Sequence, residues 1–366
     1  MQLRALPGRR WMLVVALAVA GAAPLEAQSR RTERVLLVTL DGVRWQEVFG
    51  GADAERLRGP GVRDTAELIR RFWRPTPEQR REALMPFLWT VITPQGQLFG
   101  DSARGGGGAY VTNGLWFSYP GYNELLSGSA DPRIDSNARR PNPNITVLEF
   151  LNQRPCCRGR VAAFGSWDVL PFIVNTGRSG VSANGDGPPF PSPRTDRERL
   201  LNEVADDVAL PFGAAARLDA VTMHAAFEHL RAERPRVLYV MLGETDEWAH
   251  DGRYDLYLDA AARADRFLRR LWEWAQRTPG YAGRTSLVVA TDHGRGEDRQ
   301  WTDHGRDVPA ARRIWIAVLG PDTPALGVRQ DVEVTQSQVA ATVAALLGED
   351  FRAAVPSAAA PLPGWR

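Results

Sequence analysis

The chain has 366 residues, of which 44% are hydrophobic and 24% are charged, an ordinary balance for a globular protein with a sizeable core. All 45 basic residues are arginines, and the absence of lysine excludes P-loop, protein-kinase, Schiff-base and serine–lysine chemistries, because each requires an amine. The formal net charge is +2 and falls to zero once the charged residues of the N-terminal leader are removed. Charge therefore gives no reason to expect binding to nucleic-acid polymers or to an anionic membrane.

Residues 1–27 have the pattern of a secretory signal peptide. Arg4, Arg9 and Arg10 precede an apolar run at 11–23, and a small residue stands at a plausible cleavage position. The run is short for a membrane span, although an uncleaved anchor is the alternative, and no cysteine follows it to carry a lipid. We expect a periplasmic or secreted protein with no stable membrane span after the leader is removed.

Two adjacent cysteines, Cys156 and Cys157, are the only ones in the chain. A disulfide between neighbours is disfavoured, because its geometry requires a Cα separation that a trans peptide resists. Two thiols are also too few for a structural zinc site. We interpret both as packing residues and expect the fold not to depend on a bridge.

Compact apolar runs alternate with helical patterns along most of the chain. The runs, typical of strands buried on both faces, are 35–40, 161–164, 237–242, 286–290 and 314–319. The helical patterns lie at 200–210, 214–231, 254–276 and 338–347. This alternation predicts an α/β fold, doubly wound, with a mostly parallel central sheet and helices on both faces.

Acidic and histidine residues follow several of these runs. Ligands gather beyond the carboxyl ends of the strands in doubly wound sheets, and carboxylates with neutral imidazoles suit zinc or another divalent first-row metal. Each short motif is weak alone, since an Asp-Gly pair after a strand is more typical of a turn. Together they predict a metal centre with these candidate ligands: Asp41, Ser118, Asp246, His250, Asp292, His293 and His304. The other histidines, His224 and His229, lie in a predicted helix and are interpreted as surface or core residues.

Ser118 is the candidate nucleophile. It precedes a short predicted helix that has Pro120 near its start and Gly128 at its end. A hydroxyl at a helix N-terminus feels the positive end of the helix dipole, which favours an alkoxide and a bound anion, and a nearby metal lowers its pKa further. A simple helix cap is the alternative interpretation.

The motifs in order resemble the alkaline phosphatase superfamily, and most closely its type I phosphodiesterase/nucleotide pyrophosphatase branch. They are Leu40-Asp41-Gly42, Ser118-Tyr119-Pro120 ahead of Ser127-Gly128, Asp246-x-x-x-His250, Thr291-Asp292-His293-Gly294 and His304, and the resemblance runs from about Val35 to Gly348. It implies one zinc held by Asp246, His250 and His304. A second zinc is implied at Asp41, Asp292 and His293, with Ser118 as its remaining ligand. Two ions about 4 Å apart stabilise the attacking and leaving oxygens of an in-line displacement.

The chain departs from the branch at positions that concern the substrate. Serine replaces the usual threonine at 118, Gly121-Tyr122 stands where the branch has Asn-His, and Ala249 stands where it has glycine. An asparagine often contacts the phosphoryl group in the family. The predicted substrate contacts are Asn137, Asn144, Arg44 and Tyr122, with Asn142 and Trp45 as further candidates.

The resemblance implies one alkaline phosphatase-like metallohydrolase domain at 28–366. Residues 53–108 break the alternation and are predicted to be an insertion covering the site, and 177–193, rich in Gly, Pro, Ser and Asn, is predicted to be a surface loop. We expect two divalent ions, with Zn²⁺ favoured, and a small-molecule phosphate ester, diester or monoester, as substrate.

Three alternatives to a phosphoester hydrolase remain. A sulfatase requires Cys/Ser-x-Pro-x-Arg, and here Tyr122 replaces the arginine. A phosphotransferase or phosphomutase of this superfamily typically carries a long inserted domain or several membrane spans. A non-catalytic metal-binding homologue would lack a ligand or the nucleophile, and every one is present.

Overall fold

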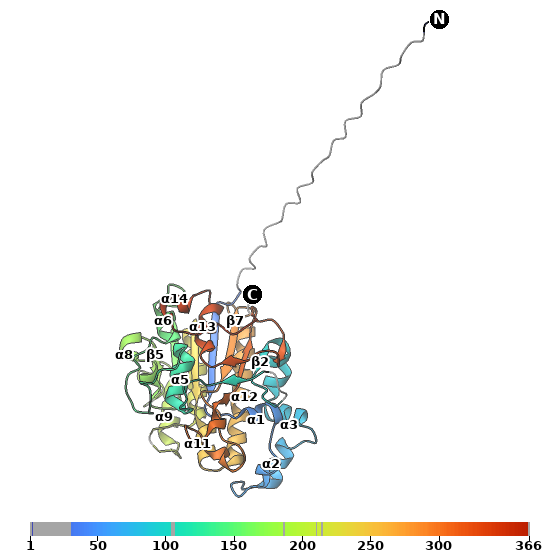
Figure 1. Cartoon of the computed structure of the whole chain (residues 1–366). Helices are drawn as coiled ribbons and strands as arrows, with labels where there is room; N and C mark the ends of the chain where they lie inside the picture. The colour runs from blue at the N-terminus through green and yellow to red at the C-terminus, as the bar shows by residue number, and fades with distance from the viewer. Residues whose placement is uncertain are drawn as a thin grey trace.

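The computed structural model describes residue 2 and residues 31–103, 107–185, 187–209, 211–213 and 215–364. Apart from residue 2, the predicted leader at 1–27 lies outside the described residues. Across these described ranges, no helix is both long enough and apolar enough to cross a bilayer. Helices flank a central sheet (Figure 1).

The central sheet has the strand order β10-β2-β9-β7-β1-β6-β4-β5. Its strands are β1 (Arg34–Leu40), β2 (Gln97–Phe99), β4 (Val161–Gly165), β5 (Ser182–Asn184), β6 (Val237–Leu242), β7 (Thr285–Ala290), β9 (Ile316–Leu319) and β10 (Gly327–Arg329). Neighbours from β7 to β5 are parallel, while β9 is antiparallel to both β7 and β2. The predicted fold class is confirmed. A smaller sheet has the order β11-β3-β8 and consists of β3 (Ala109–Tyr110), β8 (Arg313–Ile314) and β11 (Val334–Thr335).

Both faces of the sheet are buried, which explains why its strands are continuous apolar runs. Leu36 and Val38 of β1 point into one hydrophobic core, whereas Val35 and Leu37 point into the other. On the first face lie α1 (Trp45–Gly50), α2 (Thr65–Phe72), α3 (Pro77–Leu84), α10 (Asp219–Glu233) and α12 (Tyr254–Arg277). On the second face lie α5 (Ser118–Ser127), α6 (Val147–Gln153), α7 (Leu170–Ile173), α13 (Gln338–Leu346) and α14 (Phe351–Ala354).

The remaining helical segments are short or lie at the periphery. They are α4 (Thr93–Gln95), α8 (Thr176–Ser179), α9 (Asp196–Asp207), α11 (Glu244–His250), η1 (Arg56–Arg58), η2 (Leu88–Ile92), η3 (Asp298–Thr302) and η4 (Pro309–Arg312). All four predicted helices, at 200–210, 214–231, 254–276 and 338–347, are present as α9, α10, α12 and α13, with ends shifted by a few residues.

Three expectations are corrected. Residues 177–193 contain the edge strand β5, which pairs with β4. Residues 53–108 do not cover the site, because α3 packs against α1 and α12, β2 pairs with β9 and β10, and the pocket described below is lined by none of them. Cys156 and Cys157 form a disulfide across a trans peptide, in a turn where the backbone N–H of Cys157 donates to Arg154.

Candidate metal centre

The seven candidate ligands converge at the carboxyl edge of the sheet. Asp41 directly follows β1, Asp292 follows β7 after one residue, and Asp246 lies in α11, which begins two residues after β6. Because β1 pairs in parallel with both β6 and β7, these three strand ends meet at one edge. His304 reaches the same place from the loop after η3. Two overlapping groups have ligand atoms within 4.8 Å of one another: Asp41 with Asp292 and His293, and Asp246 with His293 and His304.

We call Asp41, Asp292 and His293 the inner half-site. The Nε2 atom of His293 lies 3.2 Å from Asp41 Oδ1 and 3.4 Å from Asp292 Oδ2. Asp292 and His293 are completely buried. Among the described residues, Asp41 Oδ1 and Asp292 Oδ2 have no hydrogen-bond partner, although both are buried. Buried carboxylate oxygens without a donor are costly, so this arrangement fits a cation bound between them.

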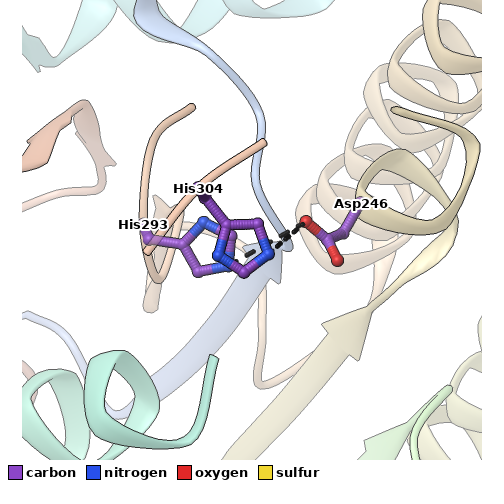
Figure 2. A group of neighbouring side chains, drawn as sticks. All are labelled: Asp246, His293 and His304. Atoms are coloured by element: carbon purple, nitrogen blue, oxygen red, sulfur yellow. Dashed lines mark ion pairs between the residues drawn. The ribbon is translucent and has the colours of Figure 1, made fainter. Parts of the chain in front are cut away.

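We call Asp246, His250 and His304 the outer half-site. His250 Nε2 lies 3.2 Å from Asp246 Oδ2 and 2.9 Å from His304 Nε2, and His304 Nε2 lies 3.5 Å from Asp246 Oδ1. Figure 2 shows the stacked rings of His293 and His304 with ion pairs to Asp246. His293 is thus also near the outer half-site, and the predicted division of ligands between two ions stays a prediction.

Backbone carbonyls orient two of the imidazoles. His293 Nδ1 lies 2.8 Å from Gly294 O, and His304 Nδ1 lies 3.3 Å from Trp116 O. A carbonyl only accepts, so each Nδ1 carries the proton and each Nε2 presents its lone pair to the cluster. Burial, and then the neighbouring His293, lower the pKa of His304 well below its ordinary value, which favours the neutral form that metals bind.

The carboxylates of the two half-sites differ in their electrostatics. Burial raises the pKa of Asp41 and of Asp292 well above the ordinary value; Asp246 adds to the effect at Asp41, and Asp41 adds to it at Asp292. Burial also opposes ionisation of Asp246, but Arg295 and then His304 outweigh it and hold the pKa of Asp246 well below its ordinary value. The inner half-site therefore has an excess of negative charge that a cation would balance, while Arg295 already balances part of the outer one.

Ser118 is the first residue of α5, and its Oγ lies 3.5 Å from His293 Nε2. The helix ends at Gly128 in the left-handed conformation, as the sequence predicts. The next backbone N–H, that of Tyr119, donates to Asn137 Oδ1 at 3.0 Å. The hydroxyl therefore sits at the positive end of a helix and beside the inner half-site.

Two glycines allow the close packing of this centre. Gly42 has a φ of +60°, and a Cβ there would lie 2.7 Å from Asp246 Oδ1. A Cβ at Gly121 would lie 2.4 Å from the carbonyl oxygen of Asp292. The latter contact gives a physical reason for glycine at 121, where the branch usually has asparagine.

The four predicted substrate contacts separate in the structure. Asn137 lines the pocket, but Asn144 instead donates to Asn123 and Asp131 away from it. The Asn144 amide instead belongs to a part-buried polar network, which gives no support to the prediction that it contacts the substrate.

Arg44 and Tyr122 are corrected as well. Arg44 is 2% exposed and pairs with Glu47 at 3.4 Å, because α1 begins directly after it and directs the guanidinium away from the site pocket. Tyr122 is fully buried and its hydroxyl donates to Asp41 Oδ2 at 2.9 Å, so it contacts a candidate ligand rather than the pocket.

A pocket of about 320 Å³ opens onto the cluster. Its lining includes Asp41, Ser118, Asp246, His250 and His304 of the candidate ligands, together with Asn137, Trp167, Phe212 and Arg217. Asp292 and His293 lie beneath it. No sequence pattern points to Trp167, Phe212 or the buried Arg295, because neither an isolated aromatic nor one arginine among 45 basic residues forms a motif.

Fold and site together define an α/β protein of the alkaline phosphatase-like class with a candidate metal centre. The family model "Type I phosphodiesterase / nucleotide pyrophosphatase" matches residues 158–336 and confirms the resemblance predicted from the sequence. Hydrolysis of phosphate or sulfate esters is typical of this family and its superfamily. The matched segment contains Asp246, His250, Asp292, His293 and His304, while Asp41 and Ser118 lie before it.

Solved structures share the fold. A putative sulfatase from Bacteroides thetaiotaomicron is 13% identical, with a TM-score of 0.57 over 92% of this chain and 73% of the other. The lipoteichoic acid synthase LtaP from Listeria monocytogenes is 12% identical, with a TM-score of 0.54 over 87% of this chain and 73% of the other. Ps i-CgsB is 16% identical, with a TM-score of 0.52 over 90% and 74%. A search of curated proteins found no match.

Proposed function

We propose that this chain is an exported phosphoester hydrolase that holds two divalent ions and acts through a Ser118 phospho-enzyme. The observation that carries the proposal is the position of Ser118 Oγ, 3.5 Å from His293 Nε2, at the start of a helix and in one pocket with the candidate ligands. The family match over 158–336 supports the reaction class. Export rests on the N-terminal leader pattern.

The donor atoms of the two half-sites fit two cations. Asp41, Asp292, His293 and Ser118 would hold one, and Asp246, His250 and His304 the other. When bound, two divalent ions such as Zn²⁺ supply Lewis-acid stabilisation of the attacking and leaving oxygens. The buried, unpartnered oxygens of Asp41 and Asp292 and the orientation of the imidazole Nε2 atoms support this assignment.

Ser118 would act as the nucleophile. Its hydroxyl loses its proton to water in the open pocket, and its oxygen forms a bond to phosphorus. The bond from phosphorus to the leaving oxygen breaks, and that oxygen takes a proton from water and departs as the alcohol. The α5 N-terminus favours the anionic serine oxygen and the phosphoryl group. Water then attacks phosphorus and the Ser118–phosphorus bond breaks, which restores the hydroxyl.

Asn137 would hold the phosphoryl group. Its Oδ1 accepts from the backbone N–H of Tyr119, which fixes the amide beside the start of α5. The opposite side of the amide is its NH₂ group, a donor suited to a phosphoryl oxygen. A volume of about 320 Å³ suits a small ester rather than a polymer. The aromatic side chains of Trp167 and Phe212 in the lining suit an apolar part of the leaving group.

Hydrolysis of chromogenic esters by the mature chain tests the proposal. We expect the 28–366 protein to contain two metal ions by mass spectrometry and to cleave bis-para-nitrophenyl phosphate or para-nitrophenyl phosphate. Chelation should remove the activity, and added Zn²⁺ should restore it. Cleavage of para-nitrophenyl sulfate in preference to both phosphates would favour the sulfatase alternative, and a metal-free protein would refute the proposal. Fractionation of cells that express residues 1–366 tests export.

A further inference from the structure

Arg295 is a buried arginine next to the candidate centre, two residues beyond His293. Its side chain is 1% exposed, among the most buried large side chains of the described residues. It is neither a predicted ligand nor one of the residues that line the pocket. Because burying a guanidinium without partners is costly, its contacts must compensate for the loss of water.

The three nitrogens of Arg295 contact two separate segments. Nη1 pairs with Oδ1 of Asp246 in α11. Nε donates to the carbonyl of Trp301 at 2.9 Å, and Nη2 donates to the carbonyl of Thr302. Both carbonyls belong to η3, which leads directly to His304. One rigid guanidinium therefore joins the helix that carries Asp246 to the loop that carries His304.

The same contact fixes the orientation of the Asp246 carboxylate. Arg295 occupies Oδ1, whereas Oδ2 lies 3.2 Å from His250 Nε2. The loop is closed further by the backbone N–H of Gly296, which donates to Asp303 at 2.9 Å. Among the described residues, the hydrogen bonds of Arg295 reach the outer half-site and its loop, and none reaches Asp41, Asp292 or His293.

We propose that Arg295 is a positioning residue of the outer half-site, which fixes Asp246 and the His304 loop in the geometry that binds the second ion. This inference rests on the proposed function, in which that half-site holds a divalent ion. Groups that orient metal ligands typically contribute 10–100-fold to metal affinity. Asp41 and Asp292 of the inner half-site take their positions from the sheet, and Arg295 makes no hydrogen bond to either within the part of the chain that the structure describes.

Zinc affinities of the intact mature protein test this role. In chelator-buffered titrations, Arg295→Met should weaken the more weakly held ion roughly 10–100-fold and leave the tighter ion unchanged. At Co²⁺ concentrations that fill both sites of the wild type, the visible spectrum of Arg295→Met should show only one site filled. Arg295→Lys should lose less affinity, because an ammonium can still reach Asp246 but cannot also bond both carbonyls.

Arg44→Met is the matched control. Arg44 is equally buried and pairs with Glu47, but its hydrogen bonds do not reach the centre. This variant should lose stability while both zinc affinities stay at the wild-type values. If Arg295→Met does not fold, Arg295→Lys carries the test through the same titration.

The possible outcomes separate the two proposals. Unchanged affinities in the Arg295 variants, or an equal loss at both ions, would overturn the positioning role while leaving the proposed function intact. A wild-type protein that binds no ions would instead overturn the proposed function itself. Selective weakening of one ion, with Arg44→Met unaffected, supports the role of Arg295.

Discussion

The inner and outer half-sites hold their side chains by different means. Asp41 and Asp292 follow two adjacent parallel strands, β1 and β7, so the sheet itself sets their separation. Asp246 and His250 lie on the short helix α11, and His304 lies on a loop. Consequently the outer half-site needs supports from elsewhere in the chain, among them Arg295 and the carbonyl of Trp116.

The two half-sites also differ in solvent exposure and charge. Asp292 and His293 are fully buried, while the His250 side chain is 44% exposed. In the described part of the chain, no arginine hydrogen-bonds to the two carboxylates of the inner half-site, whereas the single outer carboxylate is paired with Arg295. We therefore expect the inner half-site to bind its ion more tightly and the outer one to exchange its ion more readily.

Substitution of Ser118 should have the largest effect on turnover, because in the proposed mechanism this residue makes the bond on which both ions would act. Ser118→Ala should reduce kcat by about 10⁴-fold or more while both metal ions remain bound. Ser127→Ala, at the other end of α5, removes a hydroxyl that donates to the carbonyl of Ser129 and serves as the control. Wild-type turnover in Ser118→Ala would remove this residue from the role of nucleophile.

Substitution of one ligand in each half-site allows the metal binding and the turnover of the two half-sites to be compared. Asp292→Asn should eliminate binding of the inner ion and reduce turnover by about 10³-fold. His250→Ala should weaken binding of the outer ion and reduce turnover by about 10²-fold. Effects of this kind are expected for ligands of catalytic metals. Metal content by mass spectrometry after dialysis against graded chelator measures both. Loss of the same ion in the two variants would contradict the division into half-sites.

The same two variants can be compared by their unfolding temperatures in the metal-free state, where the inner substitution should be the favourable one. Burial disfavours ionised Asp292, so Asp292→Asn removes an unfavourable charge from the metal-free protein and should raise its unfolding temperature near neutral pH. The exposed His250 carries no comparable cost, and His250→Ala should leave that temperature nearly unchanged. Thermal unfolding of wild type and both variants in excess chelator measures these temperatures.

Much of the fold and of the site could be predicted from local sequence. The strands β1, β6 and β7 are buried on both faces, so their apolar runs are continuous. The candidate ligands Asp41, Asp246 and Asp292 come shortly after the ends of these strands. The edge strand β5 was missed because its sequence, Ser-Ala-Asn, carries no apolar run. Its strand character comes from pairing with β4, which only the folded chain provides.

The supporting contacts of the site could not be predicted. Arg295 meets Asp246 across 49 positions of sequence, and no spacing rule connects them. Asn137, Asn142 and Asn144 have similar surroundings in sequence, and only the path of their loop separates the pocket residue from the two in the buried polar network. Proximity in sequence was misleading for Arg44, which is three residues from Asp41 but pairs with Glu47 and does not line the pocket.

Tyr122→Phe should have a smaller effect, confined to the inner half-site. The variant removes the 2.9 Å hydrogen bond to Asp41 but keeps the buried ring. Burial raises the pKa of Tyr122 well above its ordinary value, so the hydroxyl remains a donor at any accessible pH. A net loss of about 1 kcal/mol corresponds to roughly 5-fold weaker binding of the inner ion. Chelator-buffered zinc titration checks this, and weakening of the outer ion instead would contradict the assignment.

The smallest effect on the centre is expected from Asp265, a buried residue of α12. This buried carboxylate accepts from the backbone N–H groups of Phe87 and Leu88, and burial raises its pKa to about 6. The folded form thus binds a proton more tightly than the unfolded form, and the stability that this gives is lost as pH rises from about 4 to about 6. Relative to Asp265→Asn, the free energy of unfolding of metal-free wild type should fall by about 2–3 kcal/mol over that interval. Urea unfolding at both pH values measures this difference, and a constant difference between the two proteins would show that Asp265 does not titrate there. Zinc affinities should match in the two proteins, because Asp265 bonds to the backbone of Phe87 and Leu88 and, within the described residues, to no candidate ligand.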